Sequence, residues 1–161
     1  MATHKTAYYS GATPLAIGAI IGGANEEVVE ALRAYGLATG LAFQIQDDIL
    51  NLVGTEESTK KDFRNDITEG KRTLMVVHAL NHASEKDRNR LIEILSSHET
   101  DPEILAEAVD IMEQSGGISF ARAYADALIE EAKPAVIEAV EPTVARDVLL
   151  SMGDWFVTRL A

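Results

Sequence analysis

Apolar residues recur every three or four positions through most of the chain, which is the spacing of a helix that buries one face. The longest run covers residues 25–53, where Asn25 is suited to cap the helix and Gly54 to end it. The apolar residues sharing its buried face are Leu37, Leu41, Ile45, Ile49 and Leu52. Period-two alternation and hairpin turns are absent, so the pattern predicts an all-α fold.

The same spacing predicts further helices on both sides of this long one. The first covers residues 3–22 with an interruption near Gly11–Pro14, and the others cover residues 71–82, 85–98, 102–115, 118–140 and 142–160. Pro134 should kink its helix, whereas Pro142 suits a first turn. Residues 56–70 are polar and are expected to form a loop over one end of a helical bundle. No repeat or linker divides residues 1–161, which predicts a single domain.

The amino-acid composition disfavours some classes of binding partner. The net charge of −12, from 26 acidic and 14 basic residues, argues against nucleic acid and anionic membranes as partners. The same charge would repel a diphosphate unless metal or clustered lysines held it. Cysteine is absent, which excludes disulfides and thiolate chemistry and is compatible with a cytoplasmic location. The most apolar segment, residues 15–24, is too short to span a membrane, and no secretory signal is expected.

Candidate metal ligands lie on the polar side of the long helix. Helical spacing places Gln44, Asp47, Asp48 and Asn51 on one strip, opposite the apolar face. Carboxylate and amide oxygens on a rigid helix suit Mg²⁺, which completes its shell with water and phosphate oxygens. The alternative is that both aspartates are simply solvated near the end of the helix, although carboxylates there oppose the helix dipole.

Lysines follow these aspartates along the chain. Lys60, Lys61 and Lys71 bracket Asp66, and Gly70 allows a tight approach. A lysine ammonium is a compact charge that suits phosphate oxygens. The alternative interpretation is an ordinary surface patch of paired charges.

Other side chains give weaker signals. His78 and His82 are four apart on one predicted helix, but without an HExxH motif a metal site there is not favoured. Tyr124, Trp155 and Phe156 are expected in the core or at an interface rather than at a cofactor.

Four segments, in this order, resemble the C-terminal half of the trans-isoprenyl diphosphate synthases, the polyprenyl synthetases of geranylgeranyl diphosphate synthase type. The segments are Lys5-Thr6-Ala7, Gly40 to Asn51 with its Phe-Gln-Ile-Gln-Asp-Asp core, Lys61 to Asp66, and Gly70-Lys71-Arg72-Thr73. The resemblance implies an isoprenoid-synthase-type helical bundle, with residues 1–161 as the C-terminal portion of the domain. It also implies condensation of an allylic diphosphate with isopentenyl diphosphate, assisted by Mg²⁺ held between two aspartate-rich motifs.

The resemblance implies roles for individual residues. Asp47 would bind metal directly and Asp48 through water, Asn51 replaces the third aspartate of the motif, and Asp66 is a further candidate ligand. The lysines that would grip the leaving diphosphate are Lys5, Lys61 and Lys71. The resemblance places Thr6 and Gln44 beside the developing allylic cation, and Phe43 beside isopentenyl diphosphate.

The first aspartate-rich motif of that family has no counterpart in these 161 residues. We therefore expect this chain alone to be inactive, and its apolar helix faces to associate as a homo-oligomer or with a partner carrying the N-terminal half. In the family, the residues that determine product length precede that motif. The alternative function is a non-catalytic regulatory or scaffolding subunit of a synthase. A terpene cyclase is disfavoured because its Asn/Ser/Glu metal triad is not found.

Overall fold

The computed structural model describes residues 3–54 and 64–159, with side chains described from residue 7 onward. Within these ranges the secondary structure is helical and contains no strand, which confirms the predicted all-α fold. The chain forms two compact units. Unit 1 comprises Met1–Gln46 and Tyr124–Arg159, and unit 2 comprises Asp47–Ala123 and Leu160–Ala161.

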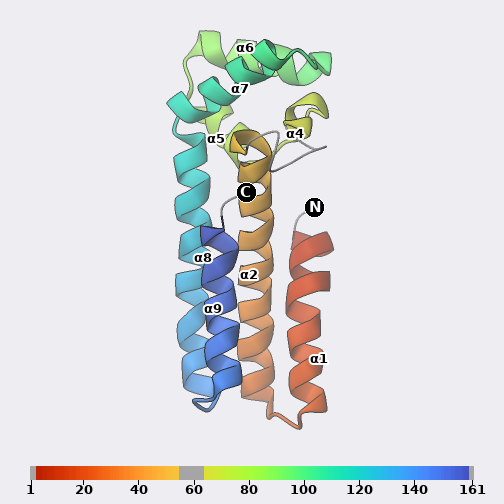
Figure 1. The fold of residues 1–161 in the computed structure, drawn as a ribbon, viewed down its shortest axis with the longest axis vertical. Helices are drawn as coiled ribbons and strands as arrows, with labels where there is room; N and C mark the ends of the chain where they lie inside the picture. The colour runs from red at the N-terminus through yellow and green to blue at the C-terminus, as the bar shows by residue number, and fades with distance from the viewer. Residues whose placement is uncertain (1–2, 55–63, 160–161) are drawn as a thin grey trace. The chain divides into compact units, whose positions relative to one another are not determined.

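Unit 1 is built on a close crossing of its first helical segment with the long helix. Its segments are η1 (Thr3–Ala12), α1 (Thr13–Ile21), α2 (Glu26–Val53) up to Gln46, α8 (Gly117–Ala139) from Tyr124, and α9 (Val144–Thr158) (Figure 1). A Cβ placed on Gly36 of α2 would lie 2.6 Å from the carbonyl oxygen of Gly11 in η1. A Cβ on Gly40 would lie 2.7 Å from the Cα of Ala7. Glycine at these positions therefore lets the two backbones touch.

Helix α9 is attached to α2 and to α8 by polar contacts. The Tyr35 hydroxyl, on a side chain only 1% exposed, donates to the carbonyl oxygens of Leu149 at 3.0 Å and Leu150 at 3.3 Å. Lys133 of α8 reaches Asp154 of α9 at 2.5 Å. A buried donor that finds carbonyl partners avoids the cost of desolvation, so the Tyr35 contacts help to specify where α9 packs within unit 1.

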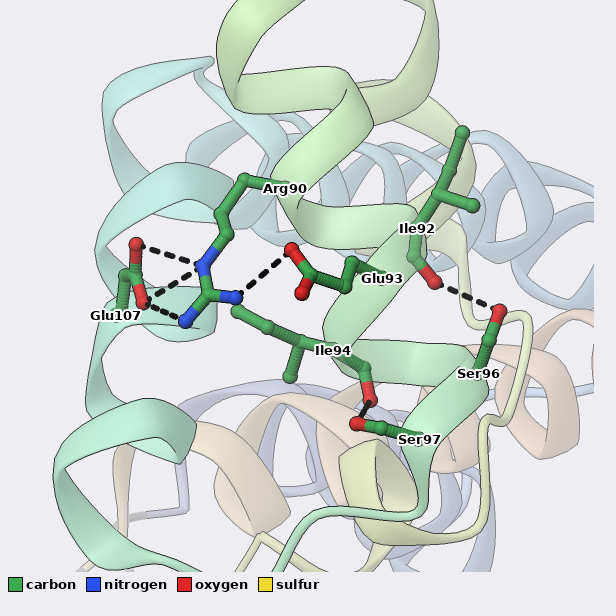
Figure 2. A network of polar contacts seen from close by, with 7 residues as sticks. All are labelled: Arg90, Ile92, Glu93, Ile94, Ser96, Ser97 and Glu107. Carbon is green, nitrogen blue, oxygen red and sulfur yellow. Dashed lines mark hydrogen bonds and ion pairs between the residues drawn. The ribbon is translucent and has the colours of Figure 1, made fainter.

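Unit 2 gathers the shorter helices. They are the end of α2, α4 (Asn65–Thr68), α5 (Leu74–His82), α6 (Glu85–Ser97), α7 (Pro102–Gln114) and the start of α8. The largest side chains of its core include Met75, Leu91, Ile94 and Met112, all at most 1% exposed. On the surface, Arg90 of α6 binds Glu107 of α7 through two nitrogens and Glu93 through a third (Figure 2).

Most predicted helices agree with the structure to within a few residues. Asn25 accepts a hydrogen bond from the N–H of Val28 at 3.0 Å, so the predicted start of the long helix is confirmed. Helices α5, α6 and α7 begin after Thr73, Ser84 and Asp101, whose side chains each accept from a backbone N–H. The helix continues through Pro134, and the kink there stays a prediction.

Three predictions need correction. The interruption near Gly11–Pro14 is a change from π-helix to α-helix, with Ala12 still helical, rather than a break. The predicted loop contains α4, since Arg64 adopts a left-handed backbone (φ 57°) that starts a new turn. Pro142 precedes α9 because the Thr143 hydroxyl accepts from the N–H of Arg146 and caps the helix instead.

Among the residues that the structure describes, no helix combines the length and apolar character needed to cross a bilayer.

Candidate functional site

The last two turns of α2 present the predicted metal ligands. Ile49 and Leu52 are buried, while Asp48 and Asn51 are half-buried and Asp47 is exposed. The predicted division of this helix into an apolar face and a polar strip is therefore found in the structure. Because these residues all belong to one helix, their relative positions follow from the helical repeat.

Lys71 brings two carboxylates together in unit 2. Its Nζ donates to Asp48 Oδ1 at 2.8 Å and to Asp66 Oδ2 at 3.0 Å. The side chains of Asp48 and Asp66 are 13% and 14% exposed, whereas that of Lys71 is 42% exposed. The three residues come from the end of α2, from α4 and from the segment before α5, so only folding makes them neighbours.

Asn51 positions the backbone of this cluster. Its carbonyl oxygen accepts from the N–H of Arg64 at 2.9 Å, and its side-chain Oδ1 accepts from the N–H of Asp66 at 3.2 Å. The N–H of Lys71 in turn donates to the carbonyl of Asp66 at 2.8 Å. Gly70, at φ 65°, makes the turn, and a Cβ there would lie 2.7 Å from the carbonyl oxygen of Leu95. This positioning role of Asn51 was not anticipated, because the family pattern suggested only a weak metal ligand.

Burial and charge act against each other in the cluster. Burial raises the pKa of Asp66, and the hydrogen bond and charge of Lys71 lower it without cancelling the rise. Burial by itself lowers the pKa of Lys71, but the hydrogen bonds and charges of Asp48 and Asp66 outweigh this effect and leave it raised. The cluster therefore holds a cation between two carboxylates that are largely withdrawn from water.

The donor set fits Mg²⁺. This ion is usually held by one or two carboxylates and fills its shell with water and phosphate oxygens. Asp48 and Asp66 already direct one oxygen each at a single cationic nitrogen. Across the described ranges, no group of three or more His, Cys, Asp or Glu side chains converges, so the site does not resemble a closed structural metal centre.

Unit 1 places an aromatic cluster around Phe43. The Phe156 ring packs edge-on against the Phe43 ring with centroids 5.2 Å apart, and the Arg159 guanidinium lies 4.1 Å above the Phe43 ring. Gln46, only 3% exposed, donates from Nε2 to the carbonyl of Arg159 at 3.0 Å. These contacts therefore hold the C-terminal end of α9 against the segment of α2 that precedes Asp47. Gln46 was not among the predicted functional residues, because its burial and its contact with Arg159 depend on the tertiary structure.

A pocket of about 360 Å³ adjoins this aromatic cluster. It is lined by Ser10, Gly11, Thr39, Gly40, Phe43 and Phe156. Gln44, predicted beside the developing cation, is half-buried on the same helix.

Several predicted residues lie outside the described part of the chain. The side chains of Lys5 and Thr6 are not described, and Lys60 and Lys61 fall in the undescribed segment 55–63. Their roles stay predictions.

The histidine pair is arranged for stacking rather than metal binding. The rings of His78 and His82 lie 4.0 Å apart and within 13° of parallel, and the His78 ring also stacks on Phe120 with centroids 4.5 Å apart. His82 Nδ1 is hydrogen-bonded to the His78 carbonyl at 2.9 Å. Nitrogen lone pairs in parallel rings do not point at one ion.

Trp155 and Tyr124, expected in the core or at an interface, are 59% and 44% exposed. The core interpretation is therefore wrong for these two residues, and the interface interpretation stays a prediction.

Comparison with known proteins agrees with the resemblance seen in the sequence. The sequence profile of the polyprenyl synthetase family matches residues 1–112. A short chain isoprenyl diphosphate synthase of Methanothermobacter thermautotrophicus is 46% identical over 142 residues, covering 88% of this chain and 43% of that protein. A geranylfarnesyl diphosphate synthase of Natronomonas pharaonis is 37% identical over 160 residues, covering 99% of this chain and 44% of that protein.

A solved structure is similar over nearly the whole chain. It is a geranylgeranyl pyrophosphate synthase from Corynebacterium glutamicum complexed with isoprenyl diphosphate and magnesium. The TM-score is 0.90 at 29% identity, and the match covers 98% of this chain and 44% of that chain. The chain described here thus spans less than half the length of these relatives.

Proposed function

The chain belongs to the polyprenyl synthetase family, and on that premise we propose that it forms the C-terminal side of a trans-prenyltransferase site. The reaction joins an allylic diphosphate to isopentenyl diphosphate. Its products would be of the short-chain, geranylgeranyl or farnesyl type, as with the similar synthases. The observation that carries the proposal is the cluster of Asp48, Asp66 and Lys71 at the end of α2.

The difficult step is departure of the allylic diphosphate. Its C–O bond breaks with the electron pair leaving on the diphosphate, and the isopentenyl double bond then forms the new C–C bond before a proton is lost. Charge builds up on the departing oxygens, so cationic groups already in place stabilise the transition state more than the ground state. Lys5, Lys61 and Lys71 are proposed to supply such cations, Lys71 from its position beside Asp48 and Asp66.

Asp47, Asp48 and Asp66 are the residues that would hold Mg²⁺, with Asn51 maintaining the backbone between Asp48 and Asp66. The bound ion supplies Lewis-acid neutralisation of the diphosphate oxygens. The similar synthase from Corynebacterium glutamicum was crystallised with isoprenyl diphosphate and magnesium, which supports this ligand set.

Phe43 and Gln44 are proposed to act on the organic part of the substrates. The Phe43 ring is held by Phe156 and Arg159, so it is a fixed apolar surface against which isopentenyl diphosphate could be oriented. The side-chain oxygen of Gln44, together with that of Thr6, is proposed to face the developing allylic cation.

Apolar side chains on α1 support the proposal of association. Ile17, Ile20 and Ile21 are 50%, 59% and 82% exposed. We propose that this face is covered in a homo-oligomer or by a partner carrying the N-terminal half of the synthase. Light scattering during size-exclusion chromatography would report the oligomer, and a strictly monomeric chain would contradict the homo-oligomer. A cytoplasmic location is proposed from the cysteine-free composition.

Ligand-dependent thermal stability tests the proposed function. Melting temperatures are measured with geranyl diphosphate, with MgCl₂, and with both. We expect stabilisation by the two together that exceeds the sum of the separate effects, and its loss in Asp47→Ala. Asp110→Ala, an exposed aspartate on α7, is the matched control and should retain the effect. Absence of any Mg²⁺-dependent shift in the wild-type chain would contradict the proposal and favour the scaffolding alternative.

A further inference from the structure

We propose that Lys71 is a built-in counter-ion that occupies the cation position between Asp48 and Asp66 until a divalent metal displaces it. Displacement would release the ammonium toward the diphosphate, so that metal loading and diphosphate capture are coupled through one side chain. This inference rests on the proposed function and concerns the regulation of that same site.

One nitrogen lies within hydrogen-bond distance of an oxygen from each carboxylate, at 2.8 and 3.0 Å. A magnesium ion held by these two carboxylates, directly or through a bound water as the resemblance implies for Asp48, would need the same oxygens. The ammonium and the metal would therefore compete for the same oxygens and the same space, and the two states exclude each other.

The lysine, and not either carboxylate, is the partner that is able to move. Asp48 lies on a long helix, and Asp66 is held through its backbone N–H by Asn51. Both carboxylates are shielded, at 13% and 14% side-chain exposure, whereas Lys71 is 42% exposed at the end of a flexible four-carbon stem. When a metal arrives, the carboxylates stay in place and the lysine swings toward solvent, where a diphosphate would approach.

A second lysine in the chain also bridges two carboxylates, but the pattern of side-chain exposure around it differs from that around Lys71. Lys133 in unit 1 also contacts two carboxylates, Glu130 at 2.6 Å and Asp154 at 2.5 Å. There the exposures are reversed, because the lysine is 18% exposed and the carboxylates are 67% and 51% exposed. The carboxylates around Lys133 are solvated, so they do not form a shielded pair that could hold a metal. Lys133 therefore provides a matched control for Lys71.

The test uses Mn²⁺ as the probe, alone, in the 161-residue chain. Binding is followed by loss of the free-ion electron paramagnetic resonance signal, with Mg²⁺ added as a competitor. Lys71→Met should bind Mn²⁺ about tenfold tighter than wild type, within the usual range of couplings between two ligands. Lys133→Met, which removes the same charge, should stay within about twofold of wild type. Equal or weaker binding by Lys71→Met would overturn the proposal, because Lys71 would then only hold the carboxylates in position.

A second measurement avoids dependence on how the variant folds. In the wild-type chain, acetylation of each lysine is followed by mass spectrometry with and without MgCl₂. The ion should accelerate labelling of Lys71 several-fold and leave Lys133 unchanged. Unchanged labelling of Lys71 at saturating Mg²⁺ would also overturn the inference. These results are distinguishable from failure of the proposed function, because that failure would appear as absence of Mg²⁺-dependent stabilisation by geranyl diphosphate.

Discussion

The side chain of Asn51, in the last turn of α2, accepts a hydrogen bond from the backbone N–H of Asp66 at 3.2 Å. The two residues are 15 positions apart in sequence. The resemblance treats Asn51 as a weakened third aspartate of a metal-binding motif. In the structure the Asn51 side chain holds the backbone of Asp66 at the start of α4. This structural role requires a hydrogen-bond acceptor but no charge.

Replacing Asn51 should therefore affect stability before any ligand is added. Asn51→Ala leaves the half-buried N–H of Asp66 without its side-chain acceptor, and we expect a loss of about 1 kcal/mol in the free energy of unfolding. Asn51→Asp keeps the acceptor and should stay close to wild type. Urea denaturation measures both, with Asn89→Ala on the surface of α6 as control. A fully stable Asn51→Ala would show that the contact contributes nothing.

The crossing of η1 over α2 predicts opposite effects for two glycine substitutions. Gly36→Ala would place a Cβ 2.6–2.7 Å from backbone atoms of Gly11, which cannot yield as a side chain could. We expect a loss of about 1–3 kcal/mol from overpacking. Gly18→Ala on α1 meets nothing within 4 Å and should stabilise the helix by about 0.5–1 kcal/mol. Thermal denaturation compares them, and similar melting temperatures for the two variants would contradict the close crossing.

Removal of the Tyr35 hydroxyl tests the attachment of α9 to α2. Tyr35→Phe deletes the donor to the Leu149 and Leu150 carbonyls while keeping the buried ring. We expect a loss of about 1 kcal/mol at neutral pH. Tyr124→Phe is the control, since Tyr124 is 44% exposed. Equal stability of Tyr35→Phe and wild type near pH 7 would argue against the attachment.

The stability of wild type should also depend more steeply on alkaline pH than that of Tyr35→Phe. Burial, reinforced by the charge of Asp154, raises the pKa of Tyr35 from 10.0 to about 12. The unfolded chain releases this proton near pH 10 while the native state retains it, so its stabilising effect is complete below pH 10 and is lost as the pH rises toward 12. Urea melts at pH 8–11.5 should therefore show a steeper decline for wild type than for Tyr35→Phe, and parallel curves would contradict the raised pKa.

Gln46 should hold the end of α9 in place. Gln46→Ala removes the donor to the Arg159 carbonyl, and the Arg159 guanidinium would lose its fixed position over Phe43. Amide hydrogen exchange in the last turn of α9, including the Arg159 N–H bonded to Trp155, should accelerate several-fold with little change at the other end of that helix. Gln114→Ala, exposed on α7, is the control. Unchanged exchange at Arg159 would show that the end of α9 is held by other contacts.

Much of the fold was readable because helices are local. The period of apolar residues identified α2, and the capping side chain of Asn25 placed the start of this helix within one residue. The strip of Asp47, Asp48 and Asn51 opposite Ile49 followed from the helical repeat alone. The predictions were wrong where a non-local contact or an unusual backbone conformation determined the structure. One example is Arg64, whose left-handed backbone starts α4 inside a predicted loop.

The sequence by itself determined the all-α class, the polar strip of α2 and the types of residue available for a metal-assisted diphosphate reaction, because these depend on residue identity and on spacing along one helix. Only the tertiary structure decided that Lys71 lies between Asp48 and Asp66, that Asn51 holds Asp66, and that Gln46 fastens Arg159. Those pairings join residues 5 to 113 positions apart. Charge and size do not specify which distant partners meet, since that depends on how the helices pack.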